Sequence, residues 1–531
     1  MKLATLILFL ALIAANTKGQ EFKYDLSLRA IDHEAPGIHS YAIAQNNGKW
    51  LVIGGRLDGL HARQPFNAFP DSWQNMNLRV IDPTSGETWT ASSASLPSGI
   101  QEQLGSTNMC FKQKADTLYM IGGYAYSPSA ADHITLPRLT TITVSALIET
   151  IINGEDISTH VKSMYDQRFA ITGGQLTFIE GKALLIGGHR FDGRYNPMGH
   201  NTYEQTYSDA IRSFDIDNSG SSPSISGYSE SVDAAHLHRR DYNLIAQIFG
   251  DESFGYMISS GVFQVNVDLP YLYPVEVRAD GYTPRTSFNQ YLSNYHSAHA
   301  TLYDTINQSC HTLFFGGMAR YYYENDALVQ DDDVPFVRTI SRLTRSSNDE
   351  LTEYALPNRM PSLEGASAEF IPNPGLDMIE GEVIMLGESL DDSLMLGHIY
   401  GGISSSALNP FTENNTAATE ATSVMYEVWL SKAEESTSIP LIGKHHFTAE
   451  VYPNPSDGEV RLMVNAPTNG NAFVTITDQA GRYVEHFEIR DMKKGVNDFD
   501  FLRAGQLPAG IYGVTLTLED IYSASCTLII R

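Results

Sequence analysis

Six side chains that could bind an anionic ligand follow glycine pairs along the chain. They are Arg56, Tyr124, His189, Arg190, Arg320 and Tyr321. Guanidinium groups beside tyrosine rings suit carboxylated or sulfated glycans and acidic peptides. The same arginines could instead pair with the nearby Asp58, Asp192 and Glu324 and only hold their loops. A binding role and a structural role therefore both stay open for these residues.

Each of these glycine pairs ends a short apolar stretch that recurs along the chain. The stretch appears at residues 50–55, 118–123, 183–188, 313–317 and 398–402. The gap between the third and fourth copies is about twice its neighbour, and residues 256–261, which end in Gly261 alone, fit there as a degenerate copy. Strand-rich units at a nearly regular period predict a propeller or a solenoid.

The order of segments within a unit favours a propeller. A short strand and a turn precede each glycine stretch, and another strand crosses back after a variable loop, as at residues 41–44 and 78–82. This order resembles that of kelch proteins, which implies four strands per blade. We expect an all-β chain with a kelch-like β-propeller of about six blades over residues 20–430. Residues 21–32 would add the strand that closes the ring, against residues 425–430.

A second resemblance concerns a metal. The tripeptide Tyr295-His296-Ser297 and Cys110 resemble parts of the galactose oxidase-type copper radical enzymes, which are also kelch propellers. The resemblance implies that Tyr295 and His296 bind copper and that Cys110 is cross-linked to a second tyrosine. The corresponding strand, residues 169–174, contains no tyrosine. Copper is therefore an alternative for which half of the ligand set is missing.

Two further clusters could bind cations. His236 and His238 would share one face of an extended segment, but a third ligand is not identifiable, and ion pairing between blades explains the cluster as well. The carboxylates at residues 331–333 could join a calcium site or form a solvated loop. We expect no cofactor, with calcium and copper as alternatives.

The last 85 residues, 447–531, alternate between apolar and polar side chains and contain regular turn signals, which predicts an immunoglobulin-like β-sandwich. They contain the motifs VYPNPSDG (451–458), DQAGR (478–482) and LPAGIY (507–512). These motifs resemble the type A C-terminal sorting domain of the type IX secretion system of Bacteroidetes. The resemblance implies that residues 447–531 engage the secretion machinery and are then usually removed.

The N-terminus reads as a secretory signal peptide over residues 1–19. Lys2 is followed by an apolar run over residues 3–15, with cleavage expected after Gly19 or after Ala15. This run is too short to span a membrane, so the mature chain should have no transmembrane segment. A polar linker is expected at residues 431–446. We expect a protein that is secreted or held at the outer-membrane surface after both terminal segments are cleaved.

Charge and cysteine content exclude several classes of protein. The net charge of −27 disfavours nucleic acid as a partner, because phosphate backbones would be repelled. The three cysteines lie far apart in sequence, which excludes a disulfide framework and zinc spacings.

These observations predict a non-catalytic binding protein for an acidic polysaccharide or a protein ligand. The alternative is a carbohydrate-active enzyme, such as a polysaccharide lyase, that uses His189, Tyr124 and an arginine. An enzyme should bring a histidine, a tyrosine and an arginine within a few ångströms, whereas a binding protein should present a broader surface of rings and arginines.

Overall fold

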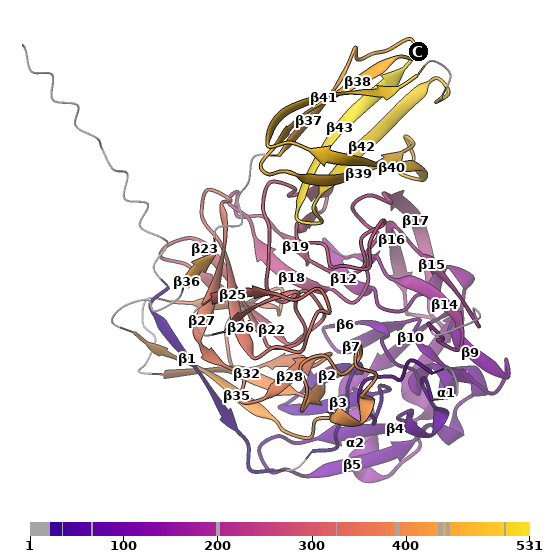
Figure 1. The fold of residues 1–531 in the computed structure, drawn as a ribbon. Coiled ribbons are helices and arrows are strands. Elements are labelled where there is room, and N and C mark those ends of the chain that lie inside the picture. The colour runs from indigo at the N-terminus through magenta and orange to yellow at the C-terminus, as the bar shows by residue number, and fades with distance from the viewer. Residues whose placement is uncertain are drawn as a thin grey trace, which may run out of the picture.

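The chain folds into strands almost throughout. The computed structural model describes residues 22–33, 35–64, 67–197, 202–324, 327–387, 393–433, 439–441, 447–503 and 506–531. The expected signal peptide and most of the expected linker lie outside these residues. The described part contains two α-helices, α1 (Ser98–Leu104) and α2 (Val144–Asn153), among many short strands (Figure 1). The all-β class is therefore confirmed, and none of the described helices is long and apolar enough to cross a membrane.

The described part of residues 22–433 forms six larger sheets, each with four principal antiparallel strands, and four small sheets of two or three strands. Sheet 1 comprises β2 (Ala42–Asn46), β3 (Lys49–Ile53), β4 (Asn77–Ile81) and β5 (Thr88–Ser92). Sheet 2 comprises β6 (Cys110–Lys114), β7 (Thr117–Ile121), β10 (Arg138–Thr143) and β11 (Val161–Tyr165). Sheet 3 comprises β12 (Gln175–Ile179), β13 (Lys182–Ile186), β16 (Ala210–Asp217) and β17 (Ser224–Val232).

The other three sheets follow the same order, with additions. Sheet 4 comprises β18 (Asn243–Ile248), β19 (Phe254–Ser259), β20 (Val275–Arg278) and β21 (Gly281–Pro284). Sheet 5 comprises β22 (His299–Asp304), β23 (Ser309–Phe315), β26 (Thr339–Arg345) and β27 (Leu351–Arg359), extended by β30 (Met378–Ile379), β31 (Val383–Leu386) and β36 (Ile439–Leu441). Sheet 6 comprises β29 (Glu369–Pro372), β32 (Ser393–Tyr400), β35 (Tyr426–Lys432) and β1 (Tyr24–Ala30).

The sixth sheet joins the two ends of this region. Strand β1 pairs antiparallel with β35 over its whole length, from Tyr24 opposite Lys432 to Ala30 opposite Tyr426. The expected pairing of residues 21–32 with residues near 425–430 is thus observed. The outer strand of the last sheet comes from the beginning of this region. Neither end of residues 22–433 can therefore detach without breaking the backbone pairing between β1 and β35.

A closed circuit of six backbone hydrogen bonds links the segments that precede the sheets. Each amide donates to the carbonyl of the residue before it in the circuit, in the order Ser40, Asn108, Gly173, Asp241, His296, Ser367 and back to Ser40. Five of the six have φ between 51° and 67°. Serine, asparagine, aspartate and glycine suit this conformation, because their short side chains tolerate the left-handed region better than β-branched ones.

The glycine pairs form a second circuit. The second glycine of each pair donates its amide to a carbonyl that precedes the next sheet, and that of sheet 6, Gly402, donates to Ile38 before sheet 1. Both glycines of every pair have positive φ, and Ser260-Gly261 adopts the same conformation with φ of 58° and 96°. The degenerate fourth copy is therefore structurally equivalent to the other five.

Apolar side chains fill the space between neighbouring sheets. One buried cluster joins each successive pair, including sheet 6 with sheet 1, where Trp50 and Val52 pack with Tyr400. Most of the core therefore lies between sheets, and each sheet depends on both neighbours.

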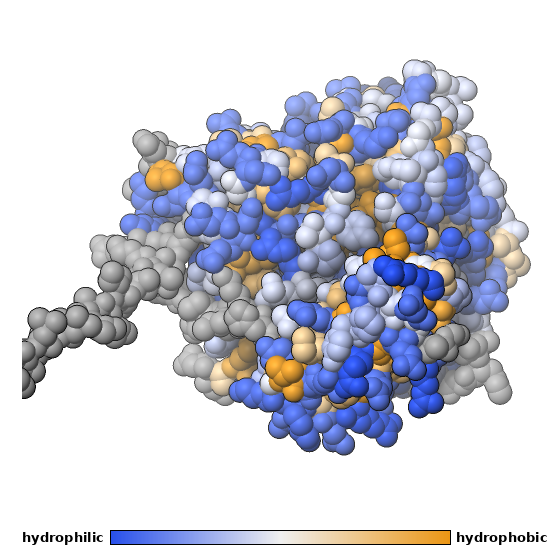
Figure 2. Space-filling view, turned by 90° about the horizontal axis from the view of Figure 1, so that it is seen from above, coloured by the Kyte–Doolittle hydropathy of each residue, from blue (hydrophilic) through white to orange (hydrophobic). Residues whose placement is uncertain are grey.

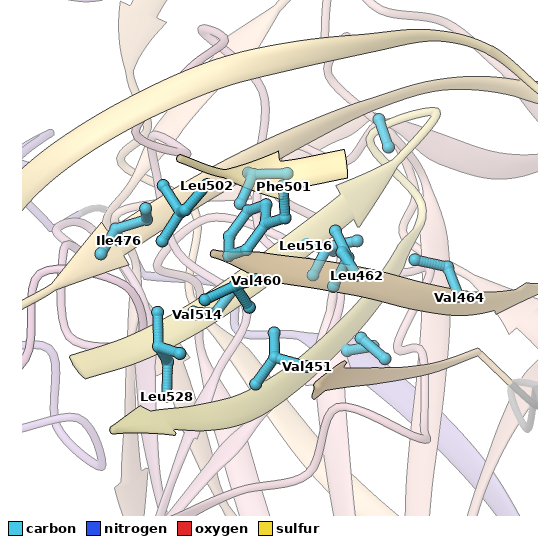
Figure 3. Packing of buried hydrophobic residues seen from close by; sticks show 14 of the residues in the cluster. Val451, Val460, Leu462, Val464, Ile476, Phe501, Leu502, Val514, Leu516 and Leu528 are labelled. Atoms are coloured by element: carbon cyan, nitrogen blue, oxygen red, sulfur yellow. The ribbon is translucent and has the colours of Figure 1, made fainter. Parts of the chain in front are cut away.

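Residues 447–531 form a separate pair of sheets. One contains β37 (Thr448–Tyr452), β38 (Val460–Ala466) and β41 (Gly495–Leu502), and the other contains β39 (Gly470–Thr477), β40 (Tyr483–Met492), β42 (Gly510–Leu518) and β43 (Tyr522–Ile530). Side chains alternate strictly between buried and exposed along β38. The buried ones, such as Leu462, Val514 and Leu516, meet in one core between the sheets (Figure 3).

We predict that Gly122→Ala destabilises the protein far more than Gly48→Ala. Both glycines have positive φ, of 68° and 76°, so both substitutions carry a backbone strain of about 1–2 kcal/mol. A Cβ at Gly122 would lie 1.7 Å from the carbonyl oxygen of Ile171 in the next sheet, whereas one at Gly48 meets nothing within 4 Å. Chemical denaturation should show an extra loss of about 2 kcal/mol or more for Gly122→Ala. Equal losses would contradict the close approach.

Candidate functional site

The three arginines singled out from the sequence are all paired with carboxylates. Arg56 is 3 % exposed and donates from Nε to Asp58 at 2.7 Å. Arg190 is exposed and donates to Asp192 at 2.6 Å. Arg320 pairs with Asp332 at 2.7 Å, not with Glu324. All three pairings can hold loops, and direct contact of these arginines with a ligand stays a prediction.

Tyr124 and His189 lie on either side of one aromatic ring. The centroid of Phe191 is 5.2 Å from that of Tyr124 and 5.8 Å from that of His189. The Tyr124 hydroxyl donates to the carbonyl of Gly193 at 2.7 Å, and the Gln205 amide donates to Nδ1 of His189 at 2.6 Å. Burial lowers the pKa of His189 to about 3, so its ring is neutral. Both side chains are buried and support the loop between the second and third strands of sheet 3.

A separate cluster of half-buried aromatic rings and guanidinium groups is formed by residues from several segments of the chain. We call it the loop cluster; it consists of His61, Arg63, Tyr195, Tyr207, Arg240 and Tyr295. The ring of His61 lies 4.9 Å from that of Tyr195 and 5.5 Å from that of Phe411, and Arg63 lies over Phe411 at 5.3 Å. The cluster thus combines the loops between the second and third strands of sheets 1 and 3 with the segments before sheets 4 and 5, and it packs against Phe411 of the corresponding loop of sheet 6.

Arg240 is the charged centre of the loop cluster. Its Nε donates to the Tyr207 hydroxyl at 3.1 Å, and its guanidinium pairs with Asp241, which belongs to the closed circuit of six hydrogen bonds. Burial alone would raise the pKa of Asp241, but Arg240 and its other neighbours lower it overall, so this carboxylate stays charged. Burial raises the pKa of Tyr295, which therefore remains a neutral phenol. The position of Arg240 is thus set by the circuit itself.

Sequence reasoning missed most of the loop cluster. Tyr295 was considered only as a copper ligand, and Arg240 only follows the histidine cluster at 236–238. His61, Arg63, Tyr195 and Tyr207 lie in variable loops without a periodic position. The one available signal was the run of tyrosines at 195, 203 and 207 after the third glycine pair.

Residues 236–239 do not form the extended segment that binding by two histidines on one face required, because a turn at residues 234–236 and a bend at Leu237 interrupt it. His238 donates from Nδ1 to Asp209 at 2.6 Å and stacks on Tyr207 with centroids 3.8 Å apart. Arg239 donates to the carbonyls of Ser260 and Tyr273. These contacts agree with the structural alternative, in which the cluster joins the segment between sheets 3 and 4 to its neighbours.

The residues considered for copper and calcium are engaged elsewhere. Cys110 is buried, which raises the pKa of its thiol to about 12. Asp332 accepts hydrogen bonds from Arg320 and Gln330, and Asp331 accepts one from Asn409. Among the described residues, no three His, Cys, Asp or Glu side chains are grouped in a way that could hold a metal ion.

A cavity of about 1100 Å³ is lined by the first strands of all six sheets. The tip of the hairpin β30–β31 reaches into it, where Glu382 pairs with Lys112 of sheet 2 and accepts a hydrogen bond from Tyr256 of sheet 4. Strand β31 runs parallel to β22. The hairpin therefore links three sheets across the cavity.

His296 and Glu369 meet in the same cavity, with Nε2 and Oε1 3.5 Å apart. Burial lowers the pKa of His296 to about 4 and raises the pKa of Glu369 to about 8. Near neutral pH both groups are therefore uncharged, and the contact joins a neutral imidazole to a protonated carboxyl group.

This burial predicts a pH dependence of stability. Glu369 keeps its proton in the folded chain up to about pH 8, while the unfolded chain loses it near 4.5. The free energy of unfolding should therefore fall as the pH rises from 4.5 to 8. Glu353, another buried carboxyl group with a pKa of about 8, contributes in the same direction. Glu369→Gln should remove about half of the decrease in melting temperature between pH 5 and 8.

The exposed Glu155 provides the control, because Glu155→Gln should leave the pH profile unchanged. A Glu369→Gln profile that coincides with that of the wild type would show that this carboxyl group is not held protonated.

Comparison with known proteins identifies the C-terminal part of the chain. The family model described as "Secretion system C-terminal sorting domain" matches residues 450–531. No curated protein matches the sequence. A solved structure titled "Structure of YjhT" is similar to 77% of this chain and 99% of its own, at 12% identity and a TM-score of 0.43.

The family match agrees with the sorting motifs at residues 451–458, 478–482 and 507–512 and with the two packed sheets that contain them. Residues 450–531 are a C-terminal sorting domain of the type IX secretion system, and the protein is secreted or displayed at the cell surface.

Proposed function

We propose that the six sheets are the blades of a kelch-type β-propeller. Three features support this: the two closed circuits of backbone hydrogen bonds, an apolar cluster between every pair of neighbouring sheets, and a cavity lined by all six first strands. In such a fold, ligands usually meet the loops where the blades converge. In the proposed propeller, the loop cluster would lie where the blades converge, because Arg240 is adjacent to Asp241 of the closed circuit of six hydrogen bonds.

On this fold we propose a non-catalytic binding protein for an acidic polysaccharide. The observation that carries the proposal is Arg240, held between Tyr207 and Asp241 and surrounded by half-buried rings. Arginine guanidinium groups bind carboxylates and sulfates through several donors, and aromatic rings cover the apolar faces of sugars. In a chain with a net charge of −27, this is a local concentration of cationic and aromatic side chains.

The residues singled out from the sequence differ in the part that they would play in this proposal. Arg56, Tyr124 and His189 support the loops that carry the cluster. Arg190 lies outside it, and Arg320 and Tyr321 lie under the sorting domain, so these three would contact only an extended ligand or one bound after that domain has left.

A lyase is the second candidate, because one arrangement fits the expectation for an enzyme. Tyr207 is hydrogen-bonded to Arg240 and stacked on His238, which Asp209 orients. In β-elimination, a base removes the proton next to the sugar carboxyl group, the glycosidic C–O bond breaks, the departing oxygen takes up a proton, and a double bond that absorbs ultraviolet light remains. Deprotonated Tyr207 would act as the base and pass this proton to the departing oxygen, while Arg240 would hold the carboxylate.

The test is a screen of the full chain without its signal peptide against acidic polysaccharides, recording both binding and ultraviolet absorbance. We predict binding without absorbance, and a loss of affinity of about tenfold or more for Arg240→Gln, equivalent to about 1.4 kcal/mol. Arg168→Gln is the matched control, since Arg168 also pairs with a neighbouring carboxylate, Asp166, but lies outside the cluster. Unchanged affinity in Arg240→Gln would refute this binding site, and an absorbing product would favour the lyase.

We further propose that the signal peptide directs passage through the inner membrane, and that the sorting domain directs passage through the outer membrane before it is removed. Deleting residues 447–531 should therefore leave the protein in the periplasm, as measured by cell fractionation and immunoblotting. The full-length Arg168→Gln variant serves as the exported control. Efficient secretion of the truncated chain would contradict this role.

A further inference from the structure

The sorting domain rests on residues of sheet 3 and on loops of sheets 4 and 5 through two turns. The turns connect β39 to β40, at residues 478–482, and β42 to β43, at residues 519–521, and both lie at the end of the domain that faces the rest of the chain (Figure 1). Seen from above, the exposed surface of the molecule is largely hydrophilic, with hydrophobic residues in small groups (Figure 2). The contacts beneath the domain are mainly hydrogen bonds.

Three side chains of the sheets converge on two consecutive carbonyls of the second turn. Asn289 donates to the carbonyl of Ile521 at 2.8 Å, while Arg320 and Gln264 donate to that of Asp520 at 3.2 and 3.3 Å. Asn289 is 0 % exposed and Arg320 is 2 % exposed. Donors buried in this way need acceptors, and the turn supplies them from its main chain.

The first turn makes a backbone contact that leaves no room for a side chain. The amide of Ala234 donates to the carbonyl of Gly481 at 2.8 Å. A Cβ at Gly481 would lie 1.6 Å from the carbonyl oxygen of Val232. Gly481 belongs to the DQAGR motif, so part of the turn that marks the sorting domain is also fitted to the surface of the sheets.

An apolar contact and two peripheral polar contacts add to the interface, one of them between Ser525 and Nε2 of His236 at 3.4 Å. Ile521 packs against a cluster that contains Tyr321, Leu272 and Leu292, with Tyr291 at its edge. Asn266 donates to the hydroxyl of Thr475 at 3.2 Å. Arg320 and Tyr321, both singled out as ligand residues, are therefore covered by the domain.

We propose that these two turns form a docking element that holds the sorting domain on sheets 3, 4 and 5 and masks Arg320 and Tyr321. The inference goes beyond the proposed function and does not depend on it. Cutting the linker then does not by itself release the domain, because the polar contacts and Ile521 keep it bound. Arg320 becomes accessible only when the domain is displaced.

The test uses the full chain without its signal peptide, with a specific protease site placed at residues 442–446. After complete cleavage, the two parts should still elute together in size-exclusion chromatography at micromolar concentration. With Gly481→Ala they should separate. Gly495→Ala is the matched control, because Gly495 also has positive φ, of 95°, but a Cβ there meets nothing within 4 Å.

A second readout reports the masking directly. Phenylglyoxal modifies accessible arginines, and mass spectrometry measures how fast Arg320 is modified. Modification of Arg320 should be at least tenfold faster in cleaved Gly481→Ala than in cleaved Gly495→Ala. Asn289→Ala changes the opposite side of the contact and should also promote separation, which keeps the test decisive if Gly481→Ala misfolds. Separation of the wild-type parts, or identical elution and modification of the Gly481→Ala and Gly495→Ala proteins, would overturn the proposal.

Discussion

The structure depends on a constraint at its centre: six segments must each place one amide and one carbonyl in a closed circuit. Four short polar residues and a glycine meet this constraint with positive φ, and His296 completes the circuit. A buried backbone group without a hydrogen-bond partner is costly. Opening one hydrogen bond of the circuit would leave one amide and one carbonyl without their partners. The glycine pairs form a second closed circuit of hydrogen bonds, at the ends of the second strands. There the backbones of neighbouring segments approach too closely for a Cβ.

The proposed site inherits its geometry from this circuit. Asp241 donates and accepts main-chain hydrogen bonds in the circuit, while its carboxylate holds Arg240 and accepts a hydrogen bond from Asn108. A side chain attached to such a position has little freedom, which suits the recognition of a ligand group at a defined distance. The variable loops then bring Tyr195, Tyr207 and His61 to this fixed charge, so their rings can differ in sequence without moving the guanidinium.

The two parts of the chain meet through main-chain carbonyls, which makes their contact depend on the shape of the turns more than on their sequence. This arrangement is compatible with a sorting domain that serves export and therefore has its own sequence requirements. It also places the sorting domain on a surface of the part of the chain whose export it directs. A ligand surface that includes Arg320 would then differ before and after the domain leaves.

The sequence by itself determined the all-β class, the repeated glycine units including the degenerate one at Gly261, the pairing of the first strand with the last sheet, and the sorting domain. The class, the repeat and the sorting domain follow from local patterns, because a strand alternates, a turn needs glycine, and a sorting motif is contiguous; the pairing of the first strand follows from the repeat, whose last sheet needs one more strand. The composition of the site was decided only in three dimensions. His61, Tyr195 and Arg240 are separated by long stretches of chain, and the same residue types occur elsewhere as paired or buried groups. Only the closure of the circuit, in which Asp241 takes part, distinguishes Arg240 from Arg56 or Arg190.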